Sequence, residues 1–398
     1  MAKLTIDDLD LKNKRVLVRV DFNVPLNENL EVTDDTRIRA ALPTIQKIID
    51  SNGKAILMSH LGRPKGKVNE SMRMAPVARR LSQLLDREVR YLTDCIGEAV
   101  EKAANELQNG EVLLLENLRF YKEEEANDPE FAKKLAKLGD VYVNDAFGTA
   151  HRAHASTEGV TKFFKQCAAG YLMQKELKYL GEAIESPARP FVAILGGAKI
   201  SGKIDVIENL MNKVDALLIG GGMTYTFLKA QNIEIGNSLL EADKIDLASD
   251  VLKKTKTQKV NFKLPTDHII AKEVSETAET KVDQTQAIPT GWAGVDIGPQ
   301  TIDQFKSILK NAKTVVWNGP MGVFEFDKFA KGTIEIAKIL AEITGKGATT
   351  VVGGGDSVAA LAKVGLTDKV THVSTGGGAS LEFLGGLKLP GVEALSDR

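Results

Sequence analysis

The sequence predicts an α/β protein with two domains, each a parallel β-sheet flanked by helices. Eight short apolar runs recur along the chain, four in each half, and polar or glycine residues follow every run. A stretch with helical spacing comes next, as in residues 43–51 and 357–365. Strands that alternate with helices in this way form parallel sheets covered by those helices. A chain of 398 residues is long enough for two such domains.

The predicted strands are rich in β-branched and other apolar residues. They occupy residues 15–22, 54–60, 112–118, 141–147, 191–197, 216–222, 314–320 and 349–357. Sheets of this kind bind their ligands beyond the carboxyl ends of the strands. The residues that end each run are therefore the candidates for function.

The two halves differ in composition, which supports a division into two domains. Of the 14 arginines, 12 lie in residues 1–170, whereas 26 of the 35 glycines follow residue 170. Residues 171–186 have Leu and Ile at helical spacing before Pro187, which predicts an interdomain helix. We expect an N-terminal domain at residues 1–170 and a C-terminal domain at 187–387.

Charge and cysteine content exclude several classes of protein. The formal net charge of −1 gives no general attraction to nucleic acid or to a membrane surface. No apolar signal core opens the chain, and no run has the length of a membrane span. Cys95 and Cys167 lie far apart and indicate free thiols in a reducing compartment. We therefore expect a cytoplasmic protein.

The strand ends of the first half are basic. Asp21 and Asn23 follow the first run, and Arg37 lies in the first turn of the next helix. The later strand ends add further candidates, namely His60, Arg63, Arg119, His151, Arg152 and His154. Any one of these could be an ordinary surface arginine or a structural histidine. Together they predict a site for a small ligand with several negative charges. The pair His151 and His154 has no thiolate or carboxylate cluster beside it, so we expect no protein-bound zinc.

The strand ends of the second half are rich in glycine. Residues 195–204 turn on two glycines and then present Lys199 and Lys203, and further glycine turns follow within 219–227, 317–325 and 351–360. Backbone N–H groups in such turns hold phosphate groups, and a glycine-lined floor admits a flat base. Four glycine turns at successive strand ends predict nucleotide binding, although no P-loop motif is present.

Two acidic residues remain open to two interpretations. Asp356, with Ser357, either caps a helix or reaches a Mg²⁺ ion that is bound to nucleotide phosphates. Glu325 is either a solvated surface residue or an acceptor for ribose hydroxyls.

At these residues the chain resembles the phosphoglycerate kinase family over essentially its whole length. The motifs that carry the resemblance stand in the family's order: DFNVPL, SHLGRP, LLLENLRFYKEEEAND, NDAFGTAHRAHAS, LGGAKISGKI, IGGGMTYTFL, WNGPMGVFEFDKFAKGT, GGGDS and STGGGASLEFLGG. The resemblance implies two Rossmann-like domains that face each other across a cleft. It also implies that residues 388–398 return to the N-terminal domain.

The resemblance implies a role for each matched residue. Contacts to 3-phosphoglycerate or 1,3-bisphosphoglycerate would come from Asp21, Asn23, Arg37, His60, Leu61, Gly62, Arg63, Arg119 and Arg152. Contacts to ADP or ATP would come from Lys203, Gly220, Gly221, Gly222, Gly294, Glu325, Gly354, Gly355, Asp356 and Ser357. Arg37, Lys199, Lys203, Gly376 and Gly377 would surround the transferred phosphoryl group, with Gly378 beside them. Asp356 would hold Mg²⁺ through the nucleotide phosphates.

The implied reaction moves a phosphoryl group between a carboxylate and a nucleotide β-phosphate. Neither nucleophile carries a proton at neutral pH, so positioning and charge stabilisation suffice without a general base. We expect the domains to close around the two substrates and exclude water.

Two other functions are weighed against this one. An acetate- or carbamate-type kinase shares the nucleophile, but its substrate lacks a second phosphate and does not need so many arginines. A non-catalytic nucleotide-binding protein on the same scaffold is the other alternative, and retention of Arg37, Lys199 and the glycines at 376–378 disfavours it. We expect a monomer that binds neither nucleic acid nor a membrane.

Overall fold

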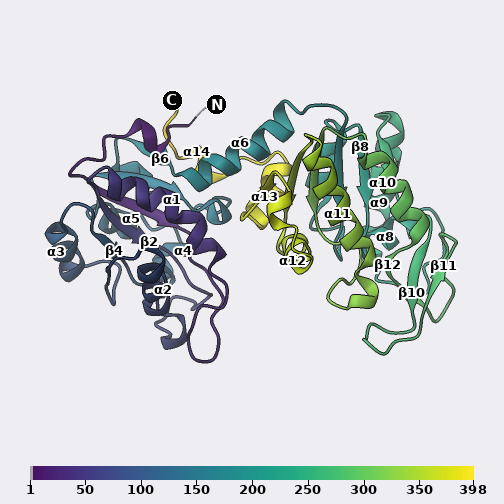
Figure 1. Cartoon of the computed structure of the whole chain (residues 1–398), viewed down its shortest axis with the longest axis horizontal. Coiled ribbons are helices and arrows are strands. Elements are labelled where there is room, and N and C mark those ends of the chain that lie inside the picture. The colour runs from purple at the N-terminus through teal and green to yellow at the C-terminus, as the bar shows by residue number, and fades with distance from the viewer. Residues whose placement is uncertain (1–2) are drawn as a thin grey trace. The chain divides into compact units, whose positions relative to one another are not determined.

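The computed structural model describes residues 3–398, which divide into two compact units (Figure 1). The first unit comprises the residues up to Leu177 together with Lys388–Arg398, and the second comprises Lys178–Leu387. The boundary lies within helix α6 (Tyr171–Glu185), which ends one residue before the predicted helix at 171–186. The first seven residues of α6 thus belong to the first unit rather than to a separate linker.

The first unit has one six-stranded parallel sheet in the order β3-β4-β2-β1-β5-β6. Its strands are β1 (Arg15–Val20), β2 (Lys54–Met58), β3 (Val89–Tyr91), β4 (Val112–Leu114), β5 (Val141–Asp145) and β6 (Cys167–Ala169). Its helices, besides the start of α6, are α1 (Thr36–Asp50), α2 (Ala75–Leu85), α3 (Glu98–Glu106), α4 (Lys122–Glu125), α5 (Pro129–Ala136) and α14 (Pro390–Glu393).

The second unit has a six-stranded parallel sheet in the order β15-β14-β13-β7-β8-β9 and a small antiparallel sheet in the order β11-β10-β12. The parallel strands are β7 (Phe191–Leu195), β8 (Ala216–Ile219), β9 (Asn261–Lys263), β13 (Thr314–Asn318), β14 (Thr349–Gly353) and β15 (His372–Val373). The antiparallel strands are β10 (His268–Ala271), β11 (Thr280–Asp283) and β12 (Ala293–Ile297). The helices are α7 (Ile204–Met211), α8 (Met223–Ala230), α9 (Ile245–Thr257), α10 (Pro299–Leu309), α11 (Lys331–Gly345), α12 (Gly355–Lys363) and α13 (Gly378–Leu384).

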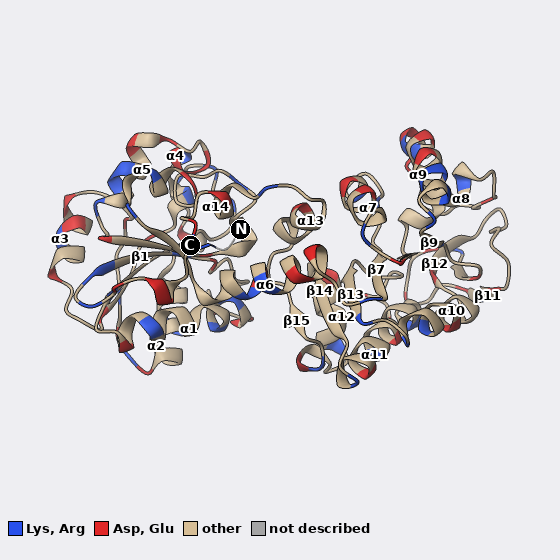
Figure 2. Ribbon diagram, turned by 90° about the horizontal axis from the view of Figure 1, so that it is seen from above, with Lys and Arg blue, Asp and Glu red and all other residues tan. Residues whose placement is uncertain are grey.

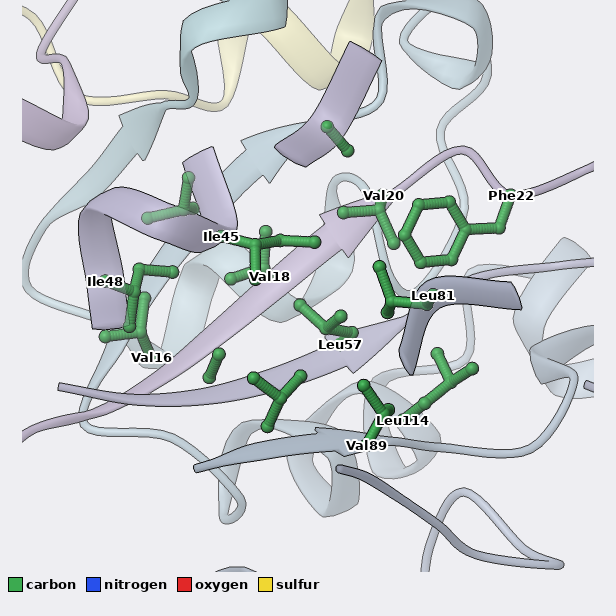
Figure 3. Packing of buried hydrophobic residues seen from close by; sticks show 14 of the residues in the cluster. Val16, Val18, Val20, Phe22, Ile45, Ile48, Leu57, Leu81, Val89 and Leu114 are labelled. Carbon is green, nitrogen blue, oxygen red and sulfur yellow. The ribbon is translucent and has the colours of Figure 1, made fainter. Parts of the chain in front are cut away.

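The core of the first unit lies between its sheet and helices α1 and α2 (Figure 3). Val16, Val18 and Val20 alternate along β1 and pack on Ile45 and Ile48 of α1. The intervening Leu17 points to the opposite face and is also fully buried. A strand buried on both faces is apolar throughout, which explains the continuous apolar runs in the sequence.

The second sheet is buried in the same way. Strands β7, β8, β13 and β14 carry no charged residue, and α10 and α11 pack on one face through residues such as Phe305 and Leu340. Charged residues lie on the helices, for example on α9, as Figure 2 shows. The sequence prediction of two α/β units with parallel sheets is confirmed by this topology.

The chain order reverses between β7 and β13 in the second sheet, and this reversal positions the site. The helical connection from β7 leads to β8 on one side and the one from β13 leads to β14 on the other, so the chain leaves these two adjacent strands in opposite directions. Such a point is where open α/β sheets bind ligands. The two loops approach closely here, because a Cβ on Gly196 would lie 2.1 Å from the carbonyl oxygen of Pro320. Only glycine fits at residue 196 without moving backbone.

The last residues of the chain complete the first unit. The amide of Gly391 donates to the carbonyl of Ala150, at 2.8 Å, and the amide of Ser396 donates to that of Cys167, at 2.9 Å. Leu4 in turn donates to the carbonyl of Ser396 at 2.8 Å. The C-terminal segment therefore lies against β6 and the N-terminal residues.

Several strands were absent from the sequence prediction. Strands β3, β6, β9 and β15 have three residues or fewer, and the antiparallel strands β10, β11 and β12 are interrupted by polar residues. Among the described residues no helix combines the length and apolar character that a membrane crossing requires. Cys95 and Cys167 are both buried and unpaired.

Candidate functional site

The basic site of the first unit begins at the end of β1. Asp21 follows the strand, and its carboxylate lies 2.7 Å from Nη1 of Arg37 in the first turn of α1. Asp21 is mostly buried, whereas the Arg37 side chain is 38% exposed. The ion pair therefore fixes the direction of the guanidinium and leaves part of it free to bind an anion.

The loop after β2 is held by residues from two other loops. Oδ1 of Asn23 accepts from the amide of Gly62 at 2.8 Å, and Nη1 of Arg119 donates to the Gly62 carbonyl at 2.9 Å. The side chain of Asn117 accepts from the backbone amide of the neighbouring Leu61 and donates to the Leu61 carbonyl. Gly62 has a φ of 63°, which an L side chain adopts only with strain. These contacts bring Asn23, Leu61, Gly62 and Arg119 together.

Arg119 is an arginine held among other cations. Its Nε lies 3.4 Å from Glu125, in an ion pair without hydrogen-bond alignment. Burial lowers the pKa of Arg119, and the nearby charges of Arg19 and Arg152 lower it further. A site with this excess of positive charge favours a ligand with several negative charges.

His60 belongs to a buried network that the sequence did not reveal. Nη2 of Arg19, on β1, lies 3.1 Å from Nδ1 of His60, and Nε of Arg19 donates to Oγ of Ser156 at 2.8 Å. The Ser156 hydroxyl donates in turn to the buried carboxylate of Glu124. Arg19 has no exposed surface. The one sign of this network in the sequence was an arginine within an apolar strand run, because a buried charge requires polar partners.

The remaining basic candidates are less constrained. Arg63 is exposed and has no polar contact among the described residues. Nε of Arg152 donates to Nε2 of His151 at 3.2 Å. His154 is buried, and burial with neighbouring arginines lowers its pKa to about 4, so it is neutral at pH 7. His154 therefore contributes no positive charge to the site.

Two adjoining cavities of the second unit lie where the chain order reverses between β7 and β13. One, of about 400 Å³, is lined by Lys199, Lys203, Gly354, Gly355 and Gly377, and by Gly378 and Asn318. The other, of about 470 Å³, is lined by Gly221, Gly222, Gly294 and Glu325, and by the apolar residues Leu239, Val274 and Val323. Gly197, Ala198, Pro320 and Asp356 line both. The first cavity is suited to a phosphate chain, and we call it the phosphate cavity. The second is suited to a base and sugar, and we call it the base cavity.

Lys203 is the most perturbed cation of this site. Its Nζ donates to Oδ1 of Asn318 at 2.6 Å. Burial lowers the pKa of Lys203 to about 8, against the opposing effect of Asp356. Asn318 is 2% exposed, and no described residue accepts from its Nδ2, which leaves a buried donor beside Gly354. Asn318 stands in the WNGP motif but was not predicted as a site residue.

Two predicted nucleotide residues, Gly220 and Ser357, do not line either cavity, and neither does Gly376, which was predicted beside the transferred phosphoryl group. Gly220 is buried, and a Cβ there would lie 2.5 Å from the sulfur of Met321, so this glycine serves packing. The buried Ser357 hydroxyl accepts from the amide of Gly319 at 2.7 Å. Gly376 is buried and donates its N–H to Oγ of Ser374 at 3.1 Å. The N–H of Gly376 is therefore not free to bind a phosphoryl group, whereas Gly377 and Gly378 lie on the cavity wall.

The interpretation of Asp356 and Ser357 as helix caps is wrong. Helix α12 begins at Gly355, and its N-cap is Gly354, with a φ of 86° and no side-chain cap. Asp356 lies in the first turn and is exposed to both cavities. Its carboxylate is therefore free to bind a ligand.

No described group of three or more His, Cys, Asp or Glu side chains is arranged to hold a metal ion. Asp356 lines the phosphate cavity but belongs to no such group. One carboxylate fits a Mg²⁺ ion that takes its other ligands from phosphate oxygens and water, as is usual in nucleotide sites.

Curated relatives match the chain over its full length. A protein of Chlorobaculum tepidum named phosphoglycerate kinase is 59% identical over 397 residues, with 100% of both chains covered. One of Chloroherpeton thalassium with the same name is 61% identical with the same coverage.

Solved structures and a family model agree with these relatives. The phosphoglycerate kinase of Coxiella burnetii is similar with a TM-score of 0.89 and 44% identity, and that of Pyrococcus horikoshii with 0.85 and 35%. Each comparison covers 98% of both chains. The family model described as phosphoglycerate kinase matches residues 6–387. The chain therefore belongs to the phosphoglycerate kinase family.

Proposed function

We propose that the chain catalyses the reversible transfer of a phosphoryl group from 1,3-bisphosphoglycerate to MgADP, giving 3-phosphoglycerate and MgATP. The observation that supports this most directly is the division of chemistry between the units. One unit gathers arginines around His60, and the other pairs a glycine-walled phosphate cavity with a base cavity. A doubly anionic acid and a nucleotide fit these two sites.

The first unit holds the acid substrate in this proposal. Arg37, Arg63, Arg119 and Arg152 bind its charged ends, with His60 and Asn23 as hydrogen-bond partners. Asp21 directs Arg37 through the 2.7 Å ion pair. Leu61 and Gly62 set the path of the loop that carries His60.

The second unit holds the nucleotide. The base and sugar occupy the cavity lined by Gly221, Gly222, Gly294 and Glu325. The phosphates lie against Gly354, Gly355 and Lys203. Asp356 would hold the Mg²⁺ ion through the phosphates, and the ion supplies charge neutralisation when bound.

The transfer itself needs no proton movement. An oxygen of the ADP β-phosphate attacks the acyl phosphorus, the bond from phosphorus to the carboxyl oxygen breaks, and the carboxylate leaves with the electron pair. Arg37, Lys199, Lys203 and the amides of Gly377 and Gly378 stabilise the charge on the transferred group. Catalysis then rests on orientation and preorganised charge.

The two substrates must meet, although their sites belong to different units. We infer that the units close when both substrates are bound and that closure excludes the water that would hydrolyse the acyl phosphate. Small-angle scattering with 3-phosphoglycerate and MgATP together should show a smaller radius of gyration than either substrate alone. An unchanged radius would contradict closure.

We also propose that the protein acts as a cytoplasmic monomer. Each site is built from residues of one chain, and the buried, unpaired Cys95 and Cys167 suit a reducing compartment.

A coupled assay tests the reaction against its alternatives. With 3-phosphoglycerate and MgATP, ADP formation is expected, and with acetate or bicarbonate plus ammonia it is not. Turnover with acetate would support a small-acid kinase of the other type. Nucleotide binding without turnover of either acid would support a non-catalytic protein.

A further inference from the structure

Glu241 joins the loop that carries the two site lysines to the wall of the base cavity. Its carboxylate oxygens accept from the amide of Ile200 at 2.5 Å, the amide of Ser201 at 3.3 Å and the Ser201 hydroxyl. Three donors from two consecutive residues on one carboxylate hold that backbone in one orientation.

The two residues held by Glu241 stand between Lys199 and Lys203. The amide of Lys203 donates to the Ile200 carbonyl at 2.9 Å, which closes a turn, and α7 begins at the next residue. The Ile200 side chain is fully buried and anchors this turn in the unit. The direction of both lysine side chains therefore follows from the position of Ile200 and Ser201.

The residues before Glu241 form part of the base cavity. We call residues 237–241 the strap. Asn237 and Leu239 line that cavity, and the Asn237 amide donates to the Trp292 carbonyl at 2.8 Å. Oγ of Ser238 accepts from the amide of Gly294, a cavity residue, at 2.9 Å. One end of the strap is thus attached beside the base and the other beside the phosphate lysines.

Leu239 gives the strap a contact surface for a ligand. It is 48% exposed on the wall of the base cavity, an unusual exposure for a leucine fixed by ordered neighbours on both sides. A base that covers Leu239 would add a contact in the middle of the strap and stabilise it in this position, and Glu241 would stabilise the lysine loop of the same unit in turn.

We propose that Glu241 is a positioning residue that couples occupation of the base cavity to the placement of Lys199 and Lys203, so that the site favours phosphates attached to a nucleoside over free polyphosphate. This inference rests on the proposed nucleotide function. Glu241 does not touch the nucleotide and acts through the backbone of residues 200–201.

The test compares ADP, adenosine and pyrophosphate by calorimetric titration of the full chain. Glu241→Leu removes both carboxylate oxygens, so the two N–H groups and the Ser201 hydroxyl lose their acceptor. We expect Glu241→Leu to weaken ADP binding about tenfold, while adenosine and pyrophosphate affinities change less than about twofold, because neither uses the coupling. Ser201→Ala removes one of the three donors and should weaken ADP about threefold.

The control is Glu342→Leu on α11, which removes a half-exposed carboxylate paired with Lys346. It should leave all three affinities unchanged. Equal ADP affinity in the wild type and Glu241→Leu would overturn the coupling. Equal losses for ADP and adenosine, with a lowered melting temperature, would also overturn it, since they indicate a general structural role. If the wild type binds neither ADP nor ATP, the proposed function fails together with the inference.

Discussion

Nη2 of Arg19 donates to Nδ1 of His60 across 3.1 Å in the interior of the first unit. Arginine carries donors only, so Nδ1 is the acceptor and the ring proton lies on Nε2. Burial is the largest cause that lowers the pKa of His60, followed by the charges of Arg19, Arg119 and Arg37. At pH 7 His60 is therefore a neutral ring with a defined tautomer, and its Nε2–H is a donor that an anion can accept from.

Replacing Arg19 should release this tautomer. In Arg19→Lys the single ammonium group cannot reach both Ser156 and His60, so we expect the KM for 3-phosphoglycerate to rise about tenfold and the KM for MgATP to stay unchanged. Nitrogen NMR of the imidazole should show a mixture of tautomers in the variant and Nε2–H alone in the wild type. Arg15→Lys, on the same strand but paired with Asp140 at 2.7 Å, serves as the control. A wild-type tautomer in Arg19→Lys would refute the assignment.

Arg37 should contribute mainly to the rate of transfer. Arg37→Ala is expected to lower kcat at saturating substrates by at least about 100-fold, the usual cost of losing one preorganised charge donor. Asp21→Asn keeps Arg37 but weakens the 2.7 Å contact that directs it, so its effect should be smaller and in the same direction. Stopped-flow or steady-state assays measure both. Turnover like that of the wild type in Arg37→Ala would remove it from the reaction site.

Lys203 should make nucleotide binding sensitive to alkaline pH. Its pKa is about 8 without ligand because burial disfavours the charged form. The ammonium form binds phosphate, so ADP affinity should be constant below about pH 7 and fall as the pH rises through 8. Lys203→Arg keeps its charge over this range and should lose the pH dependence, whatever its absolute affinity. The same decline with pH in Lys203→Arg would assign it to another group.

Gly196, in the loop after β7, and Gly355, which lines a cavity, should differ in their effect on stability. A Cβ on Gly196 would lie 2.1 Å from the Pro320 carbonyl and 2.6 Å from that of Gly319, and backbone there cannot move aside cheaply. We expect Gly196→Ala to lower the free energy of unfolding by about 2–3 kcal/mol in denaturant titrations. Gly355→Ala meets no atom within 4 Å and should change it by less than about 0.5 kcal/mol. Equal effects of the two substitutions would contradict this account.

The long apolar strands were predictable because they are buried on both faces. All eight predicted runs contain a strand, from β1 to β14. The short edge strands were missed because three residues of pattern do not stand out from loop sequence. The antiparallel sheet of β10, β11 and β12 was missed because its edge strand, Thr280–Asp283, is largely exposed and polar.

The site was predictable where a residue type carries its own chemistry. Arginines and glycine turns at strand ends predicted the two ligand classes that we propose for the two units. Arg19, Asn318 and Glu241 were not found, because each depends on a partner distant in sequence: His60, Lys203 and Ile200 respectively. Ser357 shows the converse, since its hydroxyl accepts from the amide of Gly319, which only the fold brings near. The Gly376 amide is occupied locally, by the hydroxyl of Ser374 two residues before it.

The return of residues 388–398 to the first unit has a consequence for synthesis on the ribosome. The outer edge of strand β6 is hydrogen-bonded to Leu4 and Ser396, so the first unit lacks part of its structure until residues 388–398 have emerged. The second unit, whose sequence is continuous, is fully translated before the first can be completed. Domains usually mature in the order of their sequence. In this protein the unit that begins first is the one that finishes last, and a chain truncated by about ten residues would leave the N-terminal unit incomplete while the inserted unit remains whole.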